Sequence, residues 1–213
     1  MNIETLCLGP CMTNCYIVSS DGVNCAIVDP ADNADIILKT VKKKGYVIDA
    51  ILLTHAHYDH IGALNELTKK DECLNVPVYI HSDETAFLRD VSYNLSDSLF
   101  GIHYTYDGSF CTVDNGKVVK AGGTQFKVMH TPGHTPGSVC YVCESEKTIF
   151  TGDTLFASTV GRTDFKGGSF SELLKSVSKL AALNGDYNLY PGHNAPTTLE
   201  RERKYNEFLN YEA

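Results

Sequence analysis

Residues 55–60 read His-Ala-His-Tyr-Asp-His, so four potential metal ligands occupy six positions. The hydrophobic run 47–54 precedes this string and predicts a buried β-strand, and helical spacing follows it. In an extended segment His55 and His57 project to one side and could chelate one ion. Asp59 and His60, at the entry to the helix, turn away and are better placed for a second. The string therefore predicts a two-metal site at the end of a strand, in a fold built around a sheet.

Three further polar residues follow later predicted strands, each in a turn that contains Gly: His134 in Thr-Pro-Gly-His, Asp153 in Thr-Gly-Asp-Thr and His193 in Tyr-Pro-Gly-His. A single histidine in a turn is more often a surface residue or a structural hydrogen-bonding residue. Together with the 55–60 string, however, they make seven candidate donors, enough for two ions with three or four ligands each. Imidazole and carboxylate suit Zn²⁺, and Fe and Mn accept the same donors.

Short β-rich runs alternate with helical patterns along the whole chain, without a repeat, linker or change of composition. This order predicts a single α/β domain over residues 1–213. The predicted strands cover 16–18, 25–28, 47–54, 76–80, 116–119, 124–129, 138–142, 148–150 and 187–190. The predicted helices cover 32–44, 61–70, 83–89, 171–183 and 198–209, and 92–110 is predicted to be irregular.

Composition and charge exclude several classes of protein. A hydrophobic fraction of 43% can fill a core, and a formal net charge of -8 with dispersed basic residues argues against a nucleic-acid partner. There is no apolar run of about 18 residues, and the start has neither a basic patch nor a long apolar core. We therefore expect no membrane partner, no secretory signal and a cytoplasmic location.

The chain has eight cysteines, which we expect to be reduced in the cytoplasm. Cys11 with Cys15 and Cys140 with Cys143 are spaced closely enough to be considered as metal pairs. Residues three apart on a strand point to opposite faces, so Cys140 and Cys143 are expected to be buried structural thiols.

The order of these motifs resembles the metallo-β-lactamase superfamily: His-x-His-x-Asp-His at 55–60, then His134, then Asp153 in Gly-Asp-Thr-Leu-Phe, then His193 in Pro-Gly-His. Segments 13–16, 28–30, 131–137, 152–156 and 161–164 are similar to the short glyoxalase II-like (hydroxyacylglutathione hydrolase-like) enzymes. The resemblance implies an α/β (α+β) fold, an αββα sandwich of two mixed sheets flanked by helices, with the metal centre at one rim.

The resemblance also implies roles for individual residues. It assigns His55, His57 and His134 to the first metal, Asp59, His60 and His193 to the second, and Asp153 to both as a bridge. Asp59 is the implied catalytic residue, and Arg162 matches a basic residue of the family's substrate loop. Arg162 would bind a substrate carboxylate, or else form a structural salt bridge with Asp164. True β-lactamases of the superfamily do not place a bridging Asp at this position, so antibiotic degradation is not expected.

The implied chemistry is hydrolysis by a hydroxide that two divalent ions activate, because metal binding lowers the pKa of water toward neutrality. There is no Gly-x-Ser-x-Gly nucleophile motif. A small, anionic thioester is the favoured substrate. The chain ends about 20 residues after His193, so we expect it to lack the family's C-terminal glutathione-binding helical domain. In addition, Ala195 stands where the family tends to have Tyr. Glutathione specificity is therefore in doubt.

Alternative functions remain open at this point. A persulfide dioxygenase of the same superfamily would hold one iron with His55, His134 and Asp153. A flavodiiron-type domain is disfavoured because His57 stands where that group has Glu. A nuclease is disfavoured because the chain is acidic. A non-catalytic zinc module is disfavoured because such sites are usually closed and rich in cysteine.

The other histidines, His81, His103 and His130, match no ligand position and are expected to be structural or surface residues. Segments 92–110 and 161–168 are expected to line the pocket, with an apolar lip formed by Leu95, Leu99, Phe100, Tyr104, Tyr106 and Phe165.

Overall fold

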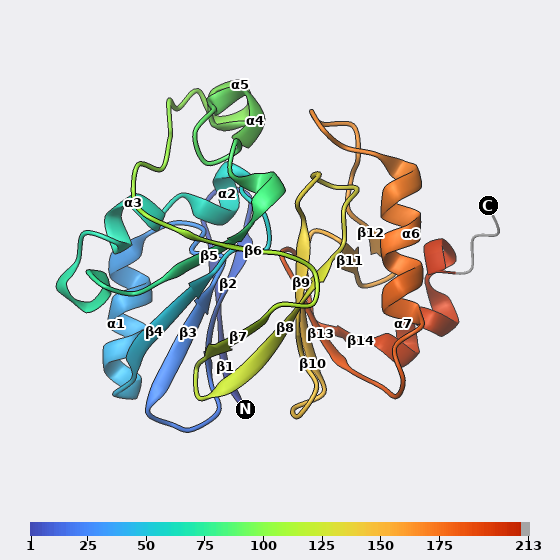
Figure 1. Ribbon diagram of the computed structural model, residues 1–213, viewed down its shortest axis with the longest axis horizontal. Helices are drawn as coiled ribbons and strands as arrows, with labels where there is room; N and C mark the ends of the chain where they lie inside the picture. Colours follow the sequence, from blue (N-terminus) through green and yellow to red (C-terminus); the bar gives the residue numbers. More distant parts are fainter. Residues whose placement is uncertain (210–213) are drawn as a thin grey trace.

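Two six-stranded mixed sheets face each other in the computed structural model, which describes residues 1–209 (Figure 1). The first sheet has the spatial order β1 (Asn2–Leu8), β2 (Thr13–Ser19), β3 (Asn24–Val28), β4 (Val47–Leu52), β5 (Val78–His81) and β6 (Cys111–Val113). The second has the order β14 (Thr197–Thr198), β13 (Asn188–Pro191), β10 (Thr148–Gly152), β9 (Val139–Cys143), β8 (Thr124–His130) and β7 (Val118–Ala121). A small pair, β11 (Leu155–Phe156) and β12 (Thr159–Val160), follows β10.

Helices cover the outer faces of both sheets. The α-helices are α1 (Ala34–Lys44), α2 (Tyr58–Ile61), α3 (Leu64–Leu67), α4 (Val91–Asn94), α5 (Ser96–Phe100), α6 (Phe170–Ala181) and α7 (Leu199–Tyr205). Three 3₁₀ turns complete the described elements: η1 (Asp71–Cys73), η2 (Ser82–Glu84) and η3 (Glu207–Leu209). Helices α1 and α3 lie outside the first sheet, and α6 and α7 lie outside the second (Figure 1). The predicted αββα sandwich is therefore confirmed.

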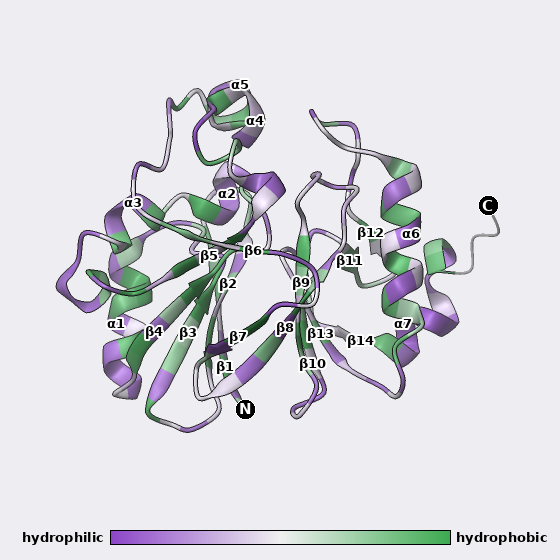
Figure 2. Cartoon of the chain, in the orientation of Figure 1, coloured by the Kyte–Doolittle hydropathy of each residue, from purple (hydrophilic) through white to green (hydrophobic). Residues whose placement is uncertain are grey.

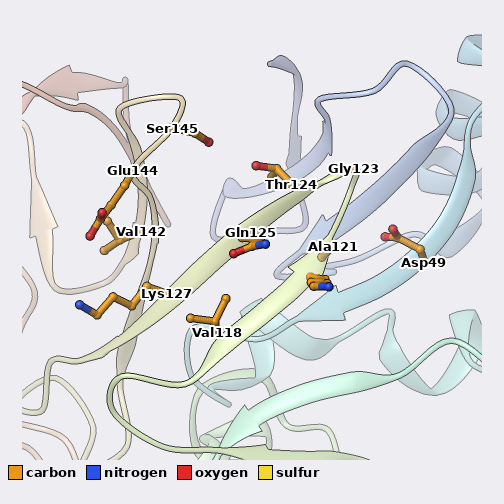
Figure 3. A pocket seen from close by; sticks show the side chains of 11 residues that line it. Asp49, Val118, Ala121, Gly123, Thr124, Gln125, Lys127, Val142, Glu144 and Ser145 are labelled. Atoms are coloured by element: carbon orange, nitrogen blue, oxygen red, sulfur yellow. The ribbon is translucent and has the colours of Figure 1, made fainter.

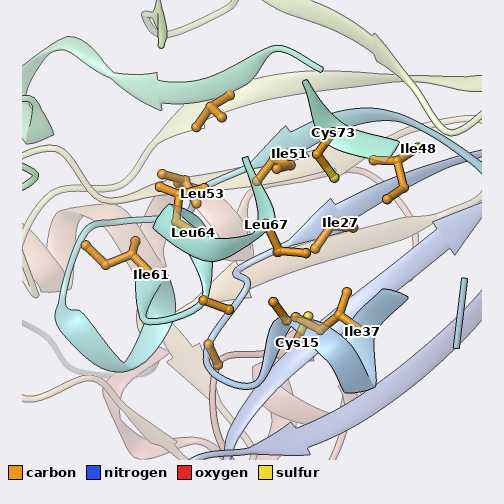
Figure 4. Close-up of a cluster of buried hydrophobic side chains, with 14 of the residues drawn as sticks. Cys15, Ile27, Ile37, Ile48, Ile51, Leu53, Ile61, Leu64, Leu67 and Cys73 are labelled. Atoms are coloured by element: carbon orange, nitrogen blue, oxygen red, sulfur yellow. The ribbon is translucent and has the colours of Figure 1, made fainter. Parts of the chain in front are cut away.

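The strands near the centre of each sheet are buried on both faces, which explains why their sequences are continuously hydrophobic. Along β2, Tyr16 and Val18 pack between the sheets, whereas Cys15 and Ile17 pack against the helices of the first layer. The helix-facing core includes side chains from α1, α3 and strands β3 and β4 (Figure 4). In strand β9, Cys140 faces the α6 layer and Cys143 faces the other sheet. The prediction that these two thiols are buried on opposite faces is confirmed.

The two long helices have the caps and the amphipathic spacing that their sequences indicate. The side chain of Asn33 accepts a hydrogen bond from the Ile36 N–H at the start of α1, and Gly45 ends that helix with φ 71°. The side chain of Ser169 caps α6 by accepting from the Glu172 N–H. Hydrophobic and hydrophilic bands alternate along α6 (Figure 2), as expected for a helix with one face on a sheet.

The predicted helix 61–70 is wrong as a single element. It is divided between α2 and α3, because the chain at Gly62 and Ala63 packs closely against the loop after β3. The Ala63 N–H donates to the Pro30 carbonyl at 3.0 Å, and a Cβ on Gly62 would lie 2.4 Å from the Ala31 oxygen. The predicted helix 83–89 is also wrong: beyond the end of η2 it contains only turns. The segment 92–110, predicted to be irregular, contains α5 and most of α4.

Strands β1 and β6, at the two edges of the first sheet, were not predicted. No helix within residues 1–209 is both long enough and apolar enough to cross a membrane.

Candidate metal centre

All seven predicted donors meet at one rim of the sandwich. The 55–60 string follows β4 and enters α2, while His134, Asp153 and His193 follow β8, β10 and β13. Strands β10 and β13 are parallel neighbours, so the loops after them emerge side by side. Three groups of side chains have ligand atoms within 4.8 Å of one another: His55 with His57 and His134; His55 with His60 and Asp153; and Asp59 with His60 and His193.

Asp153 lies between the two sets of histidines. Its Oδ2 is 3.6 Å from His134 Nε2 and 3.4 Å from His193 Nε2, and its Oδ1 is 3.4 Å from His60 Nε2. On the other side, His57 Nδ1 and His134 Nε2 are only 2.9 Å apart, with their rings nearly perpendicular. The carboxylate of Asp153 therefore reaches ligand atoms of both predicted metal sets.

Hydrogen bonds away from the centre fix which nitrogen of two histidines faces inward. The Nδ1–H of His134 donates to the Arg162 carbonyl at 2.7 Å, and the Nδ1–H of His60 donates to Asp29 Oδ2 at 2.9 Å. In the neutral form of each ring the lone pair then lies on Nε2, which faces the centre. Partners of this kind orient ligand histidines in metal sites.

Asp29 also orients His55 through Thr54. Its carboxylate accepts hydrogen bonds from the Thr54 N–H at 2.8 Å and from Thr54 Oγ1 at 2.6 Å. Because that hydroxyl proton is directed at Asp29, Thr54 Oγ1 can accept from the Nδ1–H of His55, 3.2 Å away. Asp29 has φ 50°, a left-handed conformation that Asp tolerates better than most residues. These contacts give Asp29 a structural hydrogen-bonding role beside the ligands.

Asp59 lies at the outer edge of the cluster. Thr13 Oγ1 donates to Asp59 Oδ2 at 2.8 Å, and His193 Nε2 is 3.3 Å from the same oxygen. Burial opposes ionisation of Asp59, but the nearby His60 and the contact with His193 hold its pKa well below the usual range. The carboxylate is therefore ionised and available as a ligand or as a hydrogen-bond acceptor.

The donor set fits divalent metal ions. Buried polar atoms normally have a hydrogen-bond partner, yet His55 Nε2, His60 Nε2 and Asp153 Oδ1 in this cluster have none. Burial lowers the pKa of His55 and His57, which favours the neutral imidazoles that metal ions bind. Two carboxylates surrounded by five imidazoles form a site that attracts positive charge.

Sequence analysis missed three residues that position this cluster. Thr13 and Thr54 contact Asp59 and Asp29 as described above, and Thr13 stands in the segment 13–16 that carried the resemblance. Glu84, at the end of η2, is completely buried. Its carboxylate accepts hydrogen bonds from the Ala56 N–H at 3.0 Å and from the Gly137 N–H at 2.9 Å. No local sequence signal indicates this role, because both partners are main-chain groups distant in sequence.

Arg162 is held by Asp164 in this structure. The guanidinium makes two contacts with the carboxylate, at 2.7 and 2.6 Å, and stacks over Phe165 with its central carbon 4.0 Å from the ring centroid. Both charged side chains are more than half exposed. The structure thus contains the predicted salt bridge, and binding of a substrate carboxylate by Arg162 stays a prediction.

The predicted apolar lip is only partly present. Leu95 and Tyr106 are buried in the core, so their assignment to the lip is wrong. Leu99 is 55% exposed, and Phe100 packs on Tyr58 with ring centroids 5.0 Å apart. The ring of Phe165 lies 5.8 Å from that of His57.

Other polar clusters lie outside the seven-residue centre. His81 stacks on His130 with ring centroids 4.0 Å apart, and Asp83 is near enough to form a fourth group of possible ligands with them. The ring of His130 bonds the Pro136 carbonyl and His81 accepts from the Asp83 N–H, so both rings already have structural partners. A hollow over β7, β8 and β9 is lined by Asp49, Lys120, Lys127 and other residues (Figure 3), and none of the seven donors lines it.

The sequence model of the metallo-beta-lactamase superfamily matches residues 8–193. The chain belongs to this superfamily. Among curated proteins, this chain is 38% identical over 204 residues to "Probable metallo-hydrolase YqgX" of Bacillus subtilis (strain 168), covering 95% of each chain. It is 33% identical to "Hydroxyacylglutathione hydrolase GloC" of Haemophilus influenzae, covering 99% of each chain.

Two solved structures extend this comparison of metallo-beta-lactamase superfamily members. The structure of "BLEG-1 B3 metallo-beta-lactamase" has a TM-score of 0.92 and 36% identity, covering 99% of this chain and 100% of that one. The structure of "TTHA1623 in a di-iron-bound form" has a TM-score of 0.85 and 32% identity, covering 97% and 100%. The predicted superfamily and fold are confirmed, while the relatives' names differ in activity and in metal.

Proposed function

We propose that this protein is a thioester hydrolase of the glyoxalase II-like type that uses two divalent metal ions, Zn²⁺ in the first place and Fe or Mn as alternatives. The observation that carries the proposal is the position of Asp153 between two groups of histidines, which suits a carboxylate that bridges two ions. The resemblance to a curated hydroxyacylglutathione hydrolase over nearly the full length of both chains supports thioesters as the substrate class.

The proposed ligand sets follow the geometry of the centre. His55, His57 and His134 would hold the first ion, and Asp59, His60 and His193 the second, with Asp153 shared. Two divalent ions held there would supply Lewis-acid activation of both water and the substrate carbonyl near neutral pH. A mononuclear iron site on His55, His134 and Asp153 is the alternative from sequence. It would leave His57, His60 and His193 without a role at the centre.

The chain's own residues orient the reactants. Asp59 would accept a hydrogen bond from the attacking water, and Thr13 Oγ1 holds that carboxylate in place at 2.8 Å. A thiolate is a good leaving group, so no acid side chain has to protonate it. The partner we propose is a small molecule, with Arg162 as a cation for an anionic thioester once Asp164 is displaced.

The test combines metal analysis with a substrate panel. Protein purified without added metal is analysed for metal content and assayed against thioesters that differ in their thiol carrier. We expect about two ions per chain and thioester turnover, and Asp153→Ala should lose both ions and activity. One iron per chain with oxygen consumption on persulfides would support the dioxygenase alternative instead. The control is Glu200→Ala, which removes an exposed carboxylate that is not one of the seven donors.

β-Lactam hydrolysis is a second candidate because a structure named as a B3 metallo-beta-lactamase is 36% identical with a TM-score of 0.92. The expectation against antibiotic degradation, made from Asp153, therefore stays a prediction. A chromogenic cephalosporin in the same panel tests it. Turnover of the cephalosporin without turnover of any thioester would replace our proposal.

A further inference from the structure

Glu84 is a completely buried carboxyl group outside the seven donors. Its hydrogen-bond partners among residues 1–209 are the main-chain N–H groups of Ala56 and Gly137, one to each carboxylate oxygen, together with the Thr135 side chain. No ion pair between described residues includes it. A buried carboxyl without a cation is unfavourable, and burial raises its pKa to about 7.

The two main-chain partners belong to different ligand loops. Ala56 stands between His55 and His57 in the loop after β4, and Gly137 is three residues beyond His134 in the loop before β9. These loops extend from opposite sheets. A single rigid carboxylate that accepts from both loops limits how far they can separate.

That separation determines the geometry of the three-histidine pocket. His57 Nδ1 and His134 Nε2, one from each loop, are 2.9 Å apart, close enough for one ion to bind both. An ion of Zn²⁺ size binds nitrogen at about 2.0–2.1 Å, so the two nitrogens can share one ion only while they stay within about 4.1 Å of each other, and a wider opening of the loops would break one of the two bonds.

We propose that Glu84 is a positioning residue of the metal centre, whose carboxylate holds the 55–60 string and the His134 loop at the distance at which His55, His57 and His134 bind one ion. This role goes beyond the proposed thioesterase activity and depends only on the part of that proposal that places an ion in the three-histidine pocket. It predicts that the first metal is lost when the hydrogen bonds of Glu84 to the two loops are weakened, although none of the described hydrogen bonds of Glu84 goes to a ligand side chain.

Two independent substitutions weaken the hydrogen bonds by which Glu84 connects the two loops. In Glu84→Gln the amide keeps the shape of the carboxyl group, but its NH₂ would face a main-chain N–H, so one of the two hydrogen bonds is lost. Gly137→Ala leaves the charge intact and acts on the distance, because a Cβ there would lie 2.6 Å from Glu84 Cγ. If one variant fails to fold, the other still tests the proposal.

Asp49 provides a matched control at the opposite rim. It lies near the start of β4, and its carboxylate accepts from the Gly122 N–H in the β7–β8 turn at 2.8 and 3.0 Å. It therefore also connects the two sheets through a main-chain N–H, near the start of β4, whereas the donors follow the end of β4. Figure 3 shows Asp49 near the turn that contains Gly123. Asp49→Asn imposes the same chemical change as Glu84→Gln without touching a ligand loop.

The experiment follows metal release from the purified holoenzyme to a competing chelator, with the Co²⁺ absorption spectrum and a thermal unfolding curve for each variant. We expect Glu84→Gln and Gly137→Ala to release one of the two ions about tenfold to a hundredfold faster and to change the Co²⁺ spectrum, as substitutions of residues that orient ligands do. Asp49→Asn should lower the unfolding temperature without changing release or spectrum.

Unchanged release and spectrum in both Glu84→Gln and Gly137→Ala, with two ions present in the wild type, would overturn the proposal for Glu84 alone. A wild-type protein that holds no metal would instead contradict the proposed function. Equal acceleration in Asp49→Asn would show that any loosening of the sandwich releases metal, and would also overturn the specific role of Glu84.

Discussion

At the scale of single residues, the centre depends on hydrogen-bonding groups that prevent its donors from turning. His60 and His55 are oriented by Asp29 and Thr54, and His134 by the Arg162 carbonyl. Asp59 is held by Thr13 on one side and lies beside His193 on the other. The donors are thus already arranged around a common point by the fold, which reduces the reorganisation that metal binding requires.

Asp59→Asn separates metal binding from turnover. The amide keeps the size of the side chain and its hydrogen bond from Thr13, but it removes a negative charge beside His60 and His193. We expect at least one ion to remain bound, and the rate to fall by roughly 10² to 10⁴, the range of a lost general acid–base contribution. Metal content and kcat measured on the same preparation test this, and near wild-type turnover would remove Asp59 from the mechanism.

Arg162→Ala tests the role of the substrate loop. If Arg162 binds a substrate carboxylate in ground and transition states alike, the variant should raise KM for anionic thioesters roughly tenfold with little change in kcat, and should spare neutral ones. Asp164→Asn, which releases the guanidinium from its partner, should lower KM for the same anionic substrates. Equal losses on anionic and neutral thioesters, together with a lower unfolding temperature, would instead indicate a purely structural salt bridge.

At the scale of secondary-structure elements, the sequence predicted the central strands and the two long helices well. These elements have continuous hydrophobic runs or clear caps, such as Asn33 and Gly45 at the ends of α1. The break between α2 and α3 was not predictable, because it arises from the contact of Gly62 and Ala63 with the distant loop after β3. Edge strands β1 and β6 are exposed on part of their surface and lack a strong hydrophobic pattern.

The same distinction applies to the candidate site. The donors were predictable because they stand in short motifs with characteristic spacing, and the structure brings all seven together. The role of Glu84 was not predictable, because its partners are main-chain N–H groups, which almost any residue type can supply. The lip residues Leu95 and Tyr106 were misplaced because an irregular segment gives no periodicity from which to infer the buried face.

Asp29→Asn tests the link between the loop after β3, the end of β4 and helix α2. Asp29 Oδ2 accepts from both Thr54 Oγ1 and the His60 Nδ1–H, and an amide nitrogen in that position cannot accept either bond. Asn tolerates the left-handed backbone at this position, so the main chain should be preserved. We expect metal affinity to fall about tenfold to a hundredfold, measured by chelator competition. Unchanged affinity, with circular dichroism as the check on folding, would contradict the proposed orienting role.

At the scale of the whole molecule, the buried Glu84 should make stability depend on pH. Burial raises its pKa from 4.5 to about 7 in the folded state. Between these values the folded protein binds a proton that the unfolded chain does not, so the free energy of unfolding falls as pH rises through this window. The loss should approach roughly 3 kcal/mol above pH 7, at 1.36 kcal/mol per pKa unit.

Urea unfolding of the wild type and Glu84→Gln at pH 5 and pH 8, both with chelator present, isolates this contribution. The histidine cluster titrates in both proteins and largely cancels in their difference. We expect the variant to gain stability relative to the wild type on going from pH 5 to pH 8. A difference that stays constant with pH would show that Glu84 has the same protonation state in the folded and unfolded chains.

The donors are divided between the two halves of the sandwich: four come from the first sheet's loops and three from the second's. An ion bound to both halves joins them as a cross-link that only the folded chain can form. By thermodynamic linkage, free metal at 100 times the dissociation constant of one site adds about 2.7 kcal/mol to stability. The folded fraction, and with it resistance to proteolysis, should therefore rise and fall with the supply of metal in the cell, so that metal limitation reduces the amount of this protein as well as its activity.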